Sequence, residues 1–388
     1  MLWFGSCLQE PFTTVLYHFT HTSSQDLIPM KELLEDVLEG HRLTPAEAAG
    51  LLKTRGSDVW EIAAAADIIR EQTVGDVVTY VRNQNIHVTN ICRNLCRFCA
   101  FGRPPGAPDA YDVGDAGIRA QVTLAKERGV TELCFLSGVN PAFSAERYVE
   151  MISIAHTIFP EADIHTMSPD EVTWAARKSG ITTAEVIEMT RDAGLGTMQG
   201  TGAEILVDAV RKRFCPNKVP TAEWVRIITE AHMMGLKSTA TIMYGSLDTA
   251  DDRAQHLGVI RDIQDETGGF TEFIPLPFIH ENTPLQQAGL VTGGSIGRED
   301  ILLFAVSRLF FDNIPNIQIS WGKIGDRMAS LGLIAGGNDL GGTMFTDEVS
   351  MDAGALGADY FDPADMKRIT DDLGRVLRRR STAYELLD

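Results

Sequence analysis

Short apolar runs alternate with longer amphipathic stretches along most of this chain. Seven runs rich in β-branched and aromatic residues predict strands, at 86–89, 132–136, 163–167, 197–199, 238–243, 272–275 and 317–321. The stretches between them carry apolar residues at helical spacing, above all over 117–128, 145–158, 221–234, 251–267 and 298–311. Strands that alternate with helices of about 10–15 residues indicate βαβ units and a parallel sheet.

The predicted units occupy residues 85–345, which suits a TIM-type (β/α) barrel of about 250 residues. A doubly wound sheet is the competing α/β architecture. It is disfavoured because no G-x-G-x-x-G motif follows the first predicted strand. We therefore expect an α/β fold built on a TIM-type barrel.

Three further segments flank this barrel. Residues 30–84 predict an N-terminal helical extension, in which Thr44, Pro45 and Glu47 form a capping box. Residues 346–388 predict a C-terminal helical segment, and its arginine run at 378–380 favours a solvated helix face. Residues 1–29 show no usable periodicity. They predict either a poorly ordered leader or a stretch that precedes a true start at Met30.

The charge balance narrows the choice of partners. Lys plus Arg number 34 and Asp plus Glu number 53, so the formal net charge is −19. Binding to phosphate backbones needs clustered Lys and Arg, so this acidity argues against nucleic acid as a partner. No window approaches the roughly 18 apolar residues of a membrane helix. We therefore expect a cytoplasmic protein that binds neither nucleic acid nor membrane.

Three of the six cysteines lie close together. Cys92, Cys96 and Cys99 directly follow the first predicted strand, with C-x3-C-x2-C spacing. In a parallel barrel this position is at the C-terminal face, where active sites lie. Three thiolates are one fewer than a closed zinc site or a fully ligated 4Fe-4S cluster needs. The spacing predicts a 4Fe-4S cluster with one iron left open for the amino and carboxylate groups of S-adenosylmethionine (SAM).

The alternative to a cluster is a buried helix face, because the same spacing aligns three side chains on one side of a helix. Arg93 and Arg97 would make that helix a poor core element. Cys134 lies inside a predicted strand, and we expect it to be a core residue. Cys215 and Cys7 are expected to be plain thiols.

The cysteine motif, with Phe98 before its last cysteine, resembles the signature of the radical SAM superfamily. Further motifs resemble one subgroup, at 90–101, 167–171, 200–206, 215–218 and 243–245. This subgroup contains the tyrosine 4-hydroxyphenyl transferase subunit of FO synthase and two menaquinone-pathway enzymes, aminofutalosine synthase and dehypoxanthine futalosine cyclase. The motifs at 268–276, 316–321 and 338–343 are most similar to the FO synthase subunit.

The resemblance implies a reaction in deazaflavin (coenzyme F(420)) biosynthesis. An adenosyl radical from SAM takes a hydrogen atom from L-tyrosine, the Cα–Cβ bond breaks and 2-iminoacetate leaves. The 4-hydroxybenzyl fragment joins C5 of 5-amino-6-(D-ribitylamino)uracil, and a second radical SAM protein closes the ring. The rival functions are a menaquinone-pathway enzyme, a diverged paralogue with another substrate, and a non-catalytic iron–sulfur or zinc protein.

Four residues are candidates for contact with the cofactors. We expect Phe98 to form an apolar wall beside the cluster. We expect Glu204 to hold the ribose hydroxyls of SAM, because the Gly-rich turn before it allows close backbone approach. The simpler explanation of Glu204 is a first-turn helix glutamate favoured by the helix dipole. Ser137 and Gly138 follow the second predicted strand and complete this set.

Five further candidates lie where substrates would bind. His165 and Tyr244, near two strand ends, are candidates for catalysis, with a structural histidine and core packing as the plain alternatives. Ser168, Asn338 and Asp339 are candidates for substrate binding. The last two sit in a glycine-rich stretch, where an ordinary turn is the plain alternative.

Two positions depart from the subgroup's pattern. The subgroup usually has Gly-Gly-x-His-Pro and Tyr-Gly-His motifs, and this chain has Asn140 and Ser246 in place of the two histidines. Neither residue can transfer a proton near neutral pH. If those histidines move a proton, this chain needs a substitute, and we expect His165 to provide it.

Overall fold

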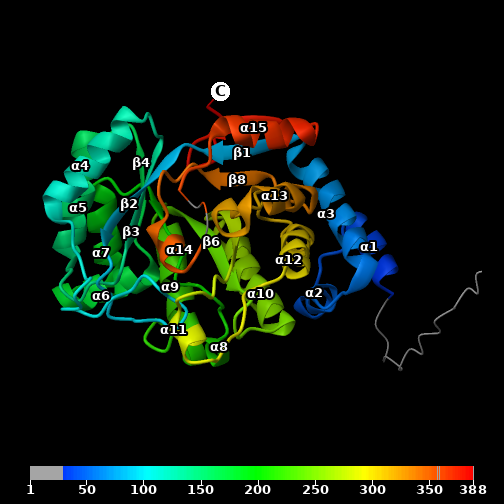
Figure 1. The fold of residues 1–388 in the computed structure, drawn as a ribbon, viewed down its shortest axis with the longest axis horizontal. Helices are drawn as coiled ribbons and strands as arrows, with labels where there is room; N and C mark the ends of the chain where they lie inside the picture. The colour runs from blue at the N-terminus through cyan, green and yellow to red at the C-terminus, as the bar shows by residue number, and fades with distance from the viewer. Residues whose placement is uncertain (1–28, 356, 358, 388) are drawn as a thin grey trace, which may run out of the picture.

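The computed structural model describes residues 29–355, 357 and 359–387. Its main sheet has six parallel strands in chain order (Figure 1). The strands are β2 (Asn83–Thr89), β3 (Glu132–Ser137), β4 (Asp163–Thr166), β5 (Thr197–Met198), β6 (Lys237–Tyr244) and β7 (Phe270–Pro277). The expectation for the leader falls outside the described residues, except for Pro29.

A smaller parallel sheet completes the strand array. Its order is β8 (Asp339–Gly342), β1 (Val77–Val81), β9 (Val376–Arg380). An irregular segment joins it to the main sheet, because Ile317 bridges to Phe273 of β7 and Gln318 bridges to Asp339 of β8. On the other side, the Thr343 hydroxyl donates to the Asn83 carbonyl of β2 at 2.8 Å. The strands therefore form a barrel-like array, which confirms the predicted fold class.

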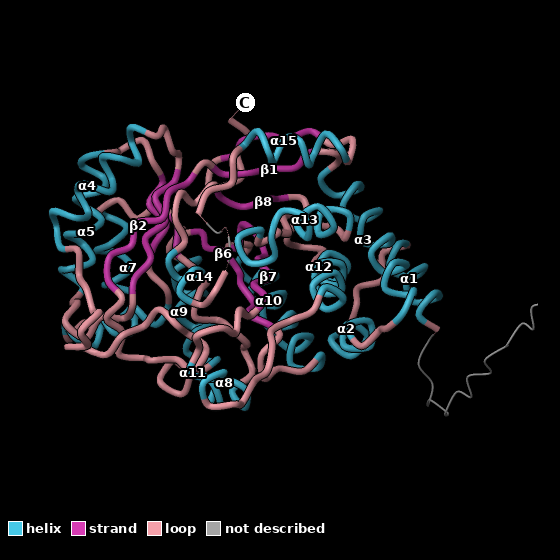
Figure 2. Tube along the Cα trace, viewed as in Figure 1, coloured by secondary structure: helices cyan, strands magenta, loops and turns pink. Residues whose placement is uncertain are grey.

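Helices cover the outside of this array (Figure 2). The helices that follow the strands are α4 (Gly114–Glu127), α5 (Ala145–Ile158), α6 (Pro169–Ser179), α7 (Thr183–Asp192), α8 (Asp208–Phe214), α9 (Thr221–Met233), α10 (Ala250–Thr267), α11 (Pro284–Gln287), α12 (Gly297–Phe310) and α13 (Trp321–Ile334). Their apolar faces pack against the strands, and the loops that join strands to helices lie at the ends of the strands.

Three N-terminal helices pack beside the barrel. They are α1 (Met30–Leu38), α2 (Pro45–Leu52) and α3 (Val59–Val74), with the short 3-10 turn η1 (Gly56–Asp58) before α3. Helix α2 lies against α10, and α3 lies against α12. The capping box that begins α2 is confirmed, since the Glu47 amide donates to Thr44 Oγ1 and the Thr44 amide donates to Glu47.

The ends of the barrel differ from the sequence prediction. Strand β1 lies in the stretch predicted to be helical, and the predicted strand at 317–321 is two bridges followed by α13. After α14 (Glu348–Asp352) and α15 (Pro363–Asp372), the arginine run forms β9 and not a solvated helix face. Arg380 is 1% exposed, because it bonds to Asp339 and Glu272 inside the barrel. Both carboxylates lie far from Arg380 along the sequence, so the local residue pattern could not predict that the arginine run forms strand β9.

Among the helices of the described part, none combines the length and apolarity needed to cross a membrane.

Candidate active site

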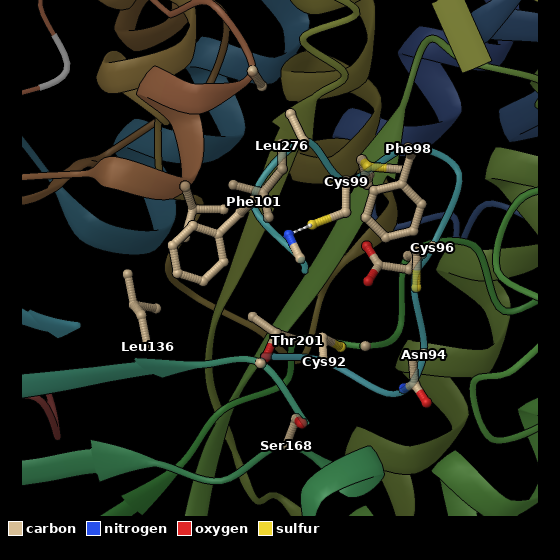
Figure 3. A pocket seen from close by; sticks show the side chains of 18 of the residues that line it. Cys92, Asn94, Cys96, Phe98, Cys99, Phe101, Leu136, Ser168, Thr201 and Leu276 are labelled. Carbon is tan, nitrogen blue, oxygen red and sulfur yellow. Dashed lines mark hydrogen bonds between the residues drawn. The ribbon is translucent and has the colours of Figure 1, made fainter. Parts of the chain in front are cut away.

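The segment that leaves β2 is an irregular loop carrying three cysteines. Cys92, Cys96 and Cys99 line one cavity of about 270 Å³ at the carboxyl ends of the strands (Figure 3). Leu95 has a φ of 43° and turns the loop between the first two cysteines. The three residues predicted as metal ligands are thus brought together in one place.

Gly138 allows the end of β3 to approach this loop. A Cβ at this position would lie 2.5 Å from the Ile91 carbonyl oxygen and 2.9 Å from the Cβ of Cys92. Both contacts are too short for any side chain, so the loop can sit on β3 only above a glycine. Ser137 lines the same cavity, and its hydroxyl donates to the Gly138 carbonyl at 2.8 Å.

The electrostatic surroundings of the thiols act in two directions. Burial raises the pKa of Cys96 and of Cys99 and so favours the protonated thiol, whereas the Gly102 amide, which donates to Cys99 Sγ at 3.4 Å, favours the thiolate that a cluster binds. In the described part of the chain, no three Cys, His, Asp or Glu side chains are placed to hold a single metal ion. A 4Fe-4S cluster does not require its three thiols to converge on one metal ion, because each thiolate binds a separate iron. Three thiols around one cavity, with an amide donor, fit three corners of a 4Fe-4S cluster.

Phe98 and Glu204 line this cavity from opposite segments. The Phe98 ring packs against Phe214 with 5.3 Å between ring centres. A Cβ at Gly200 would overlap the Thr239 carbonyl oxygen, so the Gly-rich turn can sit on β6 only with glycine there. Glu204 has a φ of 47°, and α8 begins four residues later at Asp208. The alternative of a first-turn helix glutamate is therefore wrong.

A buried network that the sequence did not reveal anchors the cysteine loop. The Asp170 carboxylate accepts hydrogen bonds from Asn94 Nδ2 at 3.1 Å, from the Val219 amide at 3.0 Å and from Lys218 Nζ at 3.2 Å. Lys218 also lies 3.5 Å from Glu204. Burial lowers the pKa of Lys218, but these carboxylates raise it more, so the ammonium stays charged. The sequence signals were the motifs at 90–101, 167–171, 200–206 and 215–218, but neither Asp170 nor Lys218 was assigned to the site.

Ser168 caps α6 at the rim of the same cavity. Its amide and its hydroxyl donate to Glu171 at 2.8 and 2.7 Å. Burial raises the pKa of Glu171, and both residues line the cavity. The Ser168 hydroxyl already has a partner, so its role as a substrate contact stays a prediction.

A second cavity, also of about 270 Å³, continues between the strands. Along β3, β6 and β7, its lining residues come earlier in the strand than those of the first cavity. We name the cavity at the cysteines the outer cavity and this one the inner cavity. The residues that line both are Leu136, Gln199, Thr201, Thr241, Leu276, Lys323 and Val349.

His165 lines the inner cavity and not the outer one. Its Nδ1 lies 2.9 Å from Thr197 Oγ1, and burial lowers its pKa to about 4. Cys134 lines the inner cavity too, where Gln199 Nε2 approaches its sulfur at 3.5 Å. Its predicted place inside a strand is confirmed, whereas its side chain lines the inner cavity and belongs to neither hydrophobic cluster. Cys215 is 1% exposed among apolar side chains, and Cys7 lies outside the described residues.

Three predicted site residues line neither cavity. The Tyr244 hydroxyl donates to Asp300 at 2.7 Å in a fully buried position. Asn338 Oδ1 accepts from Arg308 and from the Ile317 amide, so this side chain holds the last strands together. Asp339 accepts from Thr79 and Arg380. These polar groups are satisfied inside the protein and line neither cavity, so their roles in catalysis and substrate binding stay predictions.

The two positions that replace family histidines also lie away from both cavities. Asn140 Oδ1 accepts from the Ala142 amide at 3.0 Å and stabilises a turn. The Ser246 hydroxyl donates to Asp248 at 3.3 Å. In this chain, neither side chain belongs to the lining of the outer or the inner cavity.

Comparison with known proteins gives matches over nearly all of the chain. Residues 86–260 match the radical SAM superfamily, and residues 267–388 match the CofH/MqnC C-terminal region. A 5-amino-6-(D-ribitylamino)uracil–L-tyrosine 4-hydroxyphenyl transferase of Methanoculleus marisnigri is 56% identical over 359 residues, which cover 92% of this chain and 98% of that protein. The enzyme of the same name from Methanosphaerula palustris is 54% identical, with the same coverage.

Solved structures share the fold at low sequence identity. Methylornithine synthase (PylB) has a TM-score of 0.71 and 19% identity, with 89% of this chain and 97% of that chain covered. The hydrogenase maturase HydG has a TM-score of 0.72 and 16% identity, with 92% and 77% covered. The chain belongs to the radical SAM superfamily and, within it, to the 5-amino-6-(D-ribitylamino)uracil–L-tyrosine 4-hydroxyphenyl transferase family.

Proposed function

We propose that this chain is the transferase of FO synthesis. It cleaves the Cα–Cβ bond of L-tyrosine, joins the 4-hydroxybenzyl group to C5 of 5-amino-6-(D-ribitylamino)uracil and releases 2-iminoacetate. The observation that carries this proposal is the identity of more than half of the aligned residues to transferases of that name. The product passes to a second radical SAM protein, which closes the deazaflavin ring.

Cys92, Cys96 and Cys99 are the proposed ligands of a 4Fe-4S cluster. When bound, the cluster and SAM together supply a 5′-deoxyadenosyl radical that abstracts hydrogen from the substrate. The support is the position of the three thiols around the outer cavity and the amide that donates to Cys99. Within this loop, the Phe98 ring packs against Phe214. At the start of the loop, Gly138 allows Ile91 and Cys92 to lie directly against the end of β3.

Glu204, with the turn before it, is the proposed site for the ribose of SAM. A carboxylate accepts hydrogen bonds from two neighbouring hydroxyls. Lys218 holds this carboxylate at 3.5 Å and so keeps it aimed into the outer cavity. Ser137 and Gly138, at the end of β3, offer backbone groups on the opposite wall.

An apolar wall on the outer cavity keeps water from the reacting carbon. Leu136, Val139, Leu276 and Phe278 line this cavity. A carbon radical needs protection from side reactions, and a closed apolar surface provides it. The same wall suits the aromatic ring of tyrosine.

The test is anaerobic product analysis of the reconstituted protein with SAM, tyrosine, the diaminouracil and a chemical reductant. We expect 5′-deoxyadenosine, glyoxylate (from hydrolysis of 2-iminoacetate) and the benzylated uracil in equal amounts. The rival function, suggested by the resemblance of the sequence motifs, is that of a menaquinone-pathway enzyme. SAM cleavage only with a futalosine-type substrate, and none with tyrosine, would assign the chain to that pathway and overturn the proposal.

A further inference from the structure

The inner cavity lies between the two regions matched by the family comparisons. Residues of the radical SAM region line one side, among them Glu132, His165 and Thr239. Residues of the C-terminal region line the other, among them Gln318 and Ser320. Most of the lining side chains are polar. Many of these side chains bond to one another, so the accessible wall is largely apolar and the few polar groups left open on it stand out. An open polar group in a buried cavity is costly unless a ligand or water satisfies it.

The hydrogen bonds around His165 determine its tautomer. The Thr197 hydroxyl has one hydrogen, which it donates to Asp163 Oδ1 at 2.9 Å. His165 Nδ1, 2.9 Å from the same oxygen, must therefore carry a hydrogen and donate it. Nε2 is then an acceptor, and no described residue donates to it. A pKa of about 4 makes this nitrogen a weak base, so it suits a hydrogen bond better than proton transfer.

Two more polar groups on this cavity have no partner among the described residues. Asn85 Nδ2 donates to the Thr346 carbonyl at 2.8 Å, which leaves Oδ1 as a second open acceptor. The Ser320 hydroxyl, before α13, is 4% exposed and forms no hydrogen bond within the described chain. The cavity therefore offers two acceptors and one hydroxyl, from three separate segments.

The proposed reaction sets the order of the ligands. SAM must contact the cluster, tyrosine must contact SAM, and C5 of the uracil must contact the tyrosine fragment. The uracil is therefore the ligand furthest from the cysteines. Its ring carries N–H donors and carbonyl acceptors, and its ribityl chain carries hydroxyls, so it can satisfy both acceptors and the hydroxyl together, whereas the ring of tyrosine offers a single O–H donor.

We propose that the inner cavity is the diaminouracil site and that His165 Nε2 accepts a hydrogen bond from a uracil N–H. This inference rests on the proposed function. His165 is then a positioning residue for the acceptor substrate. It is not the substitute base that the missing histidines suggested.

The test uses the reconstituted holoenzyme with His165→Leu, which leaves the ring N–H of the substrate without an acceptor. We expect the KM for the diaminouracil to rise about tenfold, since an unsatisfied buried donor weakens binding by that order. The KM for tyrosine, and 5′-deoxyadenosine formation with tyrosine alone, should change less than about twofold. His165→Gln keeps an acceptor oxygen and should restore part of the loss.

The control is His232→Leu, which removes another buried histidine, bonded to Thr267 and Ser238 outside both cavities. It should leave both KM values unchanged. An unchanged diaminouracil KM in His165→Leu, or an equal rise in both KM values, would overturn the assignment. If His165→Leu does not fold, Ser320→Ala deletes one hydroxyl and must show the same selective rise.

Direct binding separates this site from the function. Calorimetry with the diaminouracil alone should show binding to the wild-type holoenzyme and weaker binding to His165→Leu. Binding without turnover would refute the transferase proposal and leave the site intact. Turnover with no selective effect of His165→Leu would refute the site and leave the function intact.

A separate observation concerns Lys323, which lines both cavities in the first turn of α13. Its ammonium donates to the Ser350 hydroxyl, and no described carboxylate lies within 4.0 Å of it. A helix N-terminus disfavours a cation. A half-buried cation in that position, with no anion beside it, points to an anionic group on a ligand.

We infer that Lys323 binds the carboxylate of tyrosine, at the boundary where the proposed reaction places this substrate. The probe is tyramine, which lacks the carboxylate. Wild-type holoenzyme should bind tyrosine at least about tenfold more tightly than tyramine, and Lys323→Met should bind the two alike. Lys323→Arg should keep the preference. A preserved preference in Lys323→Met, or a selective rise in the KM for SAM, would overturn the inference and leave the proposed reaction untouched.

Discussion

Lys218→Met should destabilise the protein and loosen the cysteine loop at once. The Lys218 side chain is 12% exposed and bridges Asp170, which is 3% exposed, and Glu204, which is 13% exposed. Methionine keeps most of the chain volume but leaves two carboxylates without their cation. Removing one partner of a buried ion pair typically costs about 3–5 kcal/mol, because the remaining charge stays desolvated. That is a large fraction of the stability of a typical protein, about 5–15 kcal/mol.

The assay is anaerobic urea denaturation of Lys218→Met, Asp170→Asn and the double variant, each with iron content measured beforehand. If the cost comes from an unpaired carboxylate, Asp170→Asn should relieve part of it. The double variant should then be more stable than the sum of the single effects predicts, by about 0.5–3 kcal/mol. Because Asn94 bonds to Asp170, iron content should fall together with stability.

Strict additivity would refute the explanation, since it would mean that Lys218 and Asp170 do not interact. Full stability of Lys218→Met would refute it equally. Lys212→Met is a matched control, because Lys212 lies on the exposed side of α8 and loses the same charge. We expect its stability and iron content to equal those of the wild type.

Three further predictions concern the cluster loop and the buried histidines. Cys96→Ala should lose bound iron and SAM cleavage, whereas Cys134→Ala should keep its iron; a wild-type rate of 5′-deoxyadenosine formation in Cys96→Ala would contradict the ligand assignment. Gly138→Ala should displace the loop at Ile91 and so lower the iron content of the protein, which iron analysis measures. A wild-type iron content would contradict this, since it would mean that the backbone adjusts to the added methyl group. Burial lowers the pKa of His256 to about 3, whereas the pKa of a histidine in the unfolded chain is near 6.5. The neutral histidine therefore contributes fully to the free energy of unfolding above about pH 6.5, and this contribution is lost as the pH falls toward 3. The free energy of unfolding of His256→Gln should vary less steeply with pH between about 6.5 and 4, by at most about 1.4 kcal/mol per pH unit; an unchanged slope would contradict this.

The cysteine site was predictable because its signal is local. Three thiols spaced four and three residues apart, directly after a strand, must share one loop at one end of a parallel sheet. Helix periodicity was equally local, and α5 has the same bounds as the prediction. Strand β1 was missed because it directly follows the helical extension and pairs with β8 and β9, which are remote in sequence. Strands β8 and β9 carry an acid and arginines that are buried only by pairing across the barrel.

Tertiary structure alone decided which polar residues line a cavity. Asn338 and Asp339 have suitable chemistry, but Arg308, Thr79 and Arg380 satisfy them internally. Asp170 and Lys218 are 48 residues apart, so no local pattern could pair them.

The state of His165 likewise depends on Thr197 and Asp163, which only the pairing of neighbouring strands brings into contact. Sequence therefore determined the kind of chemistry, because ligand spacing is a property of one segment. The orientation of each polar group was left to the fold, because a hydrogen bond joins atoms according to distance in space and not distance along the chain.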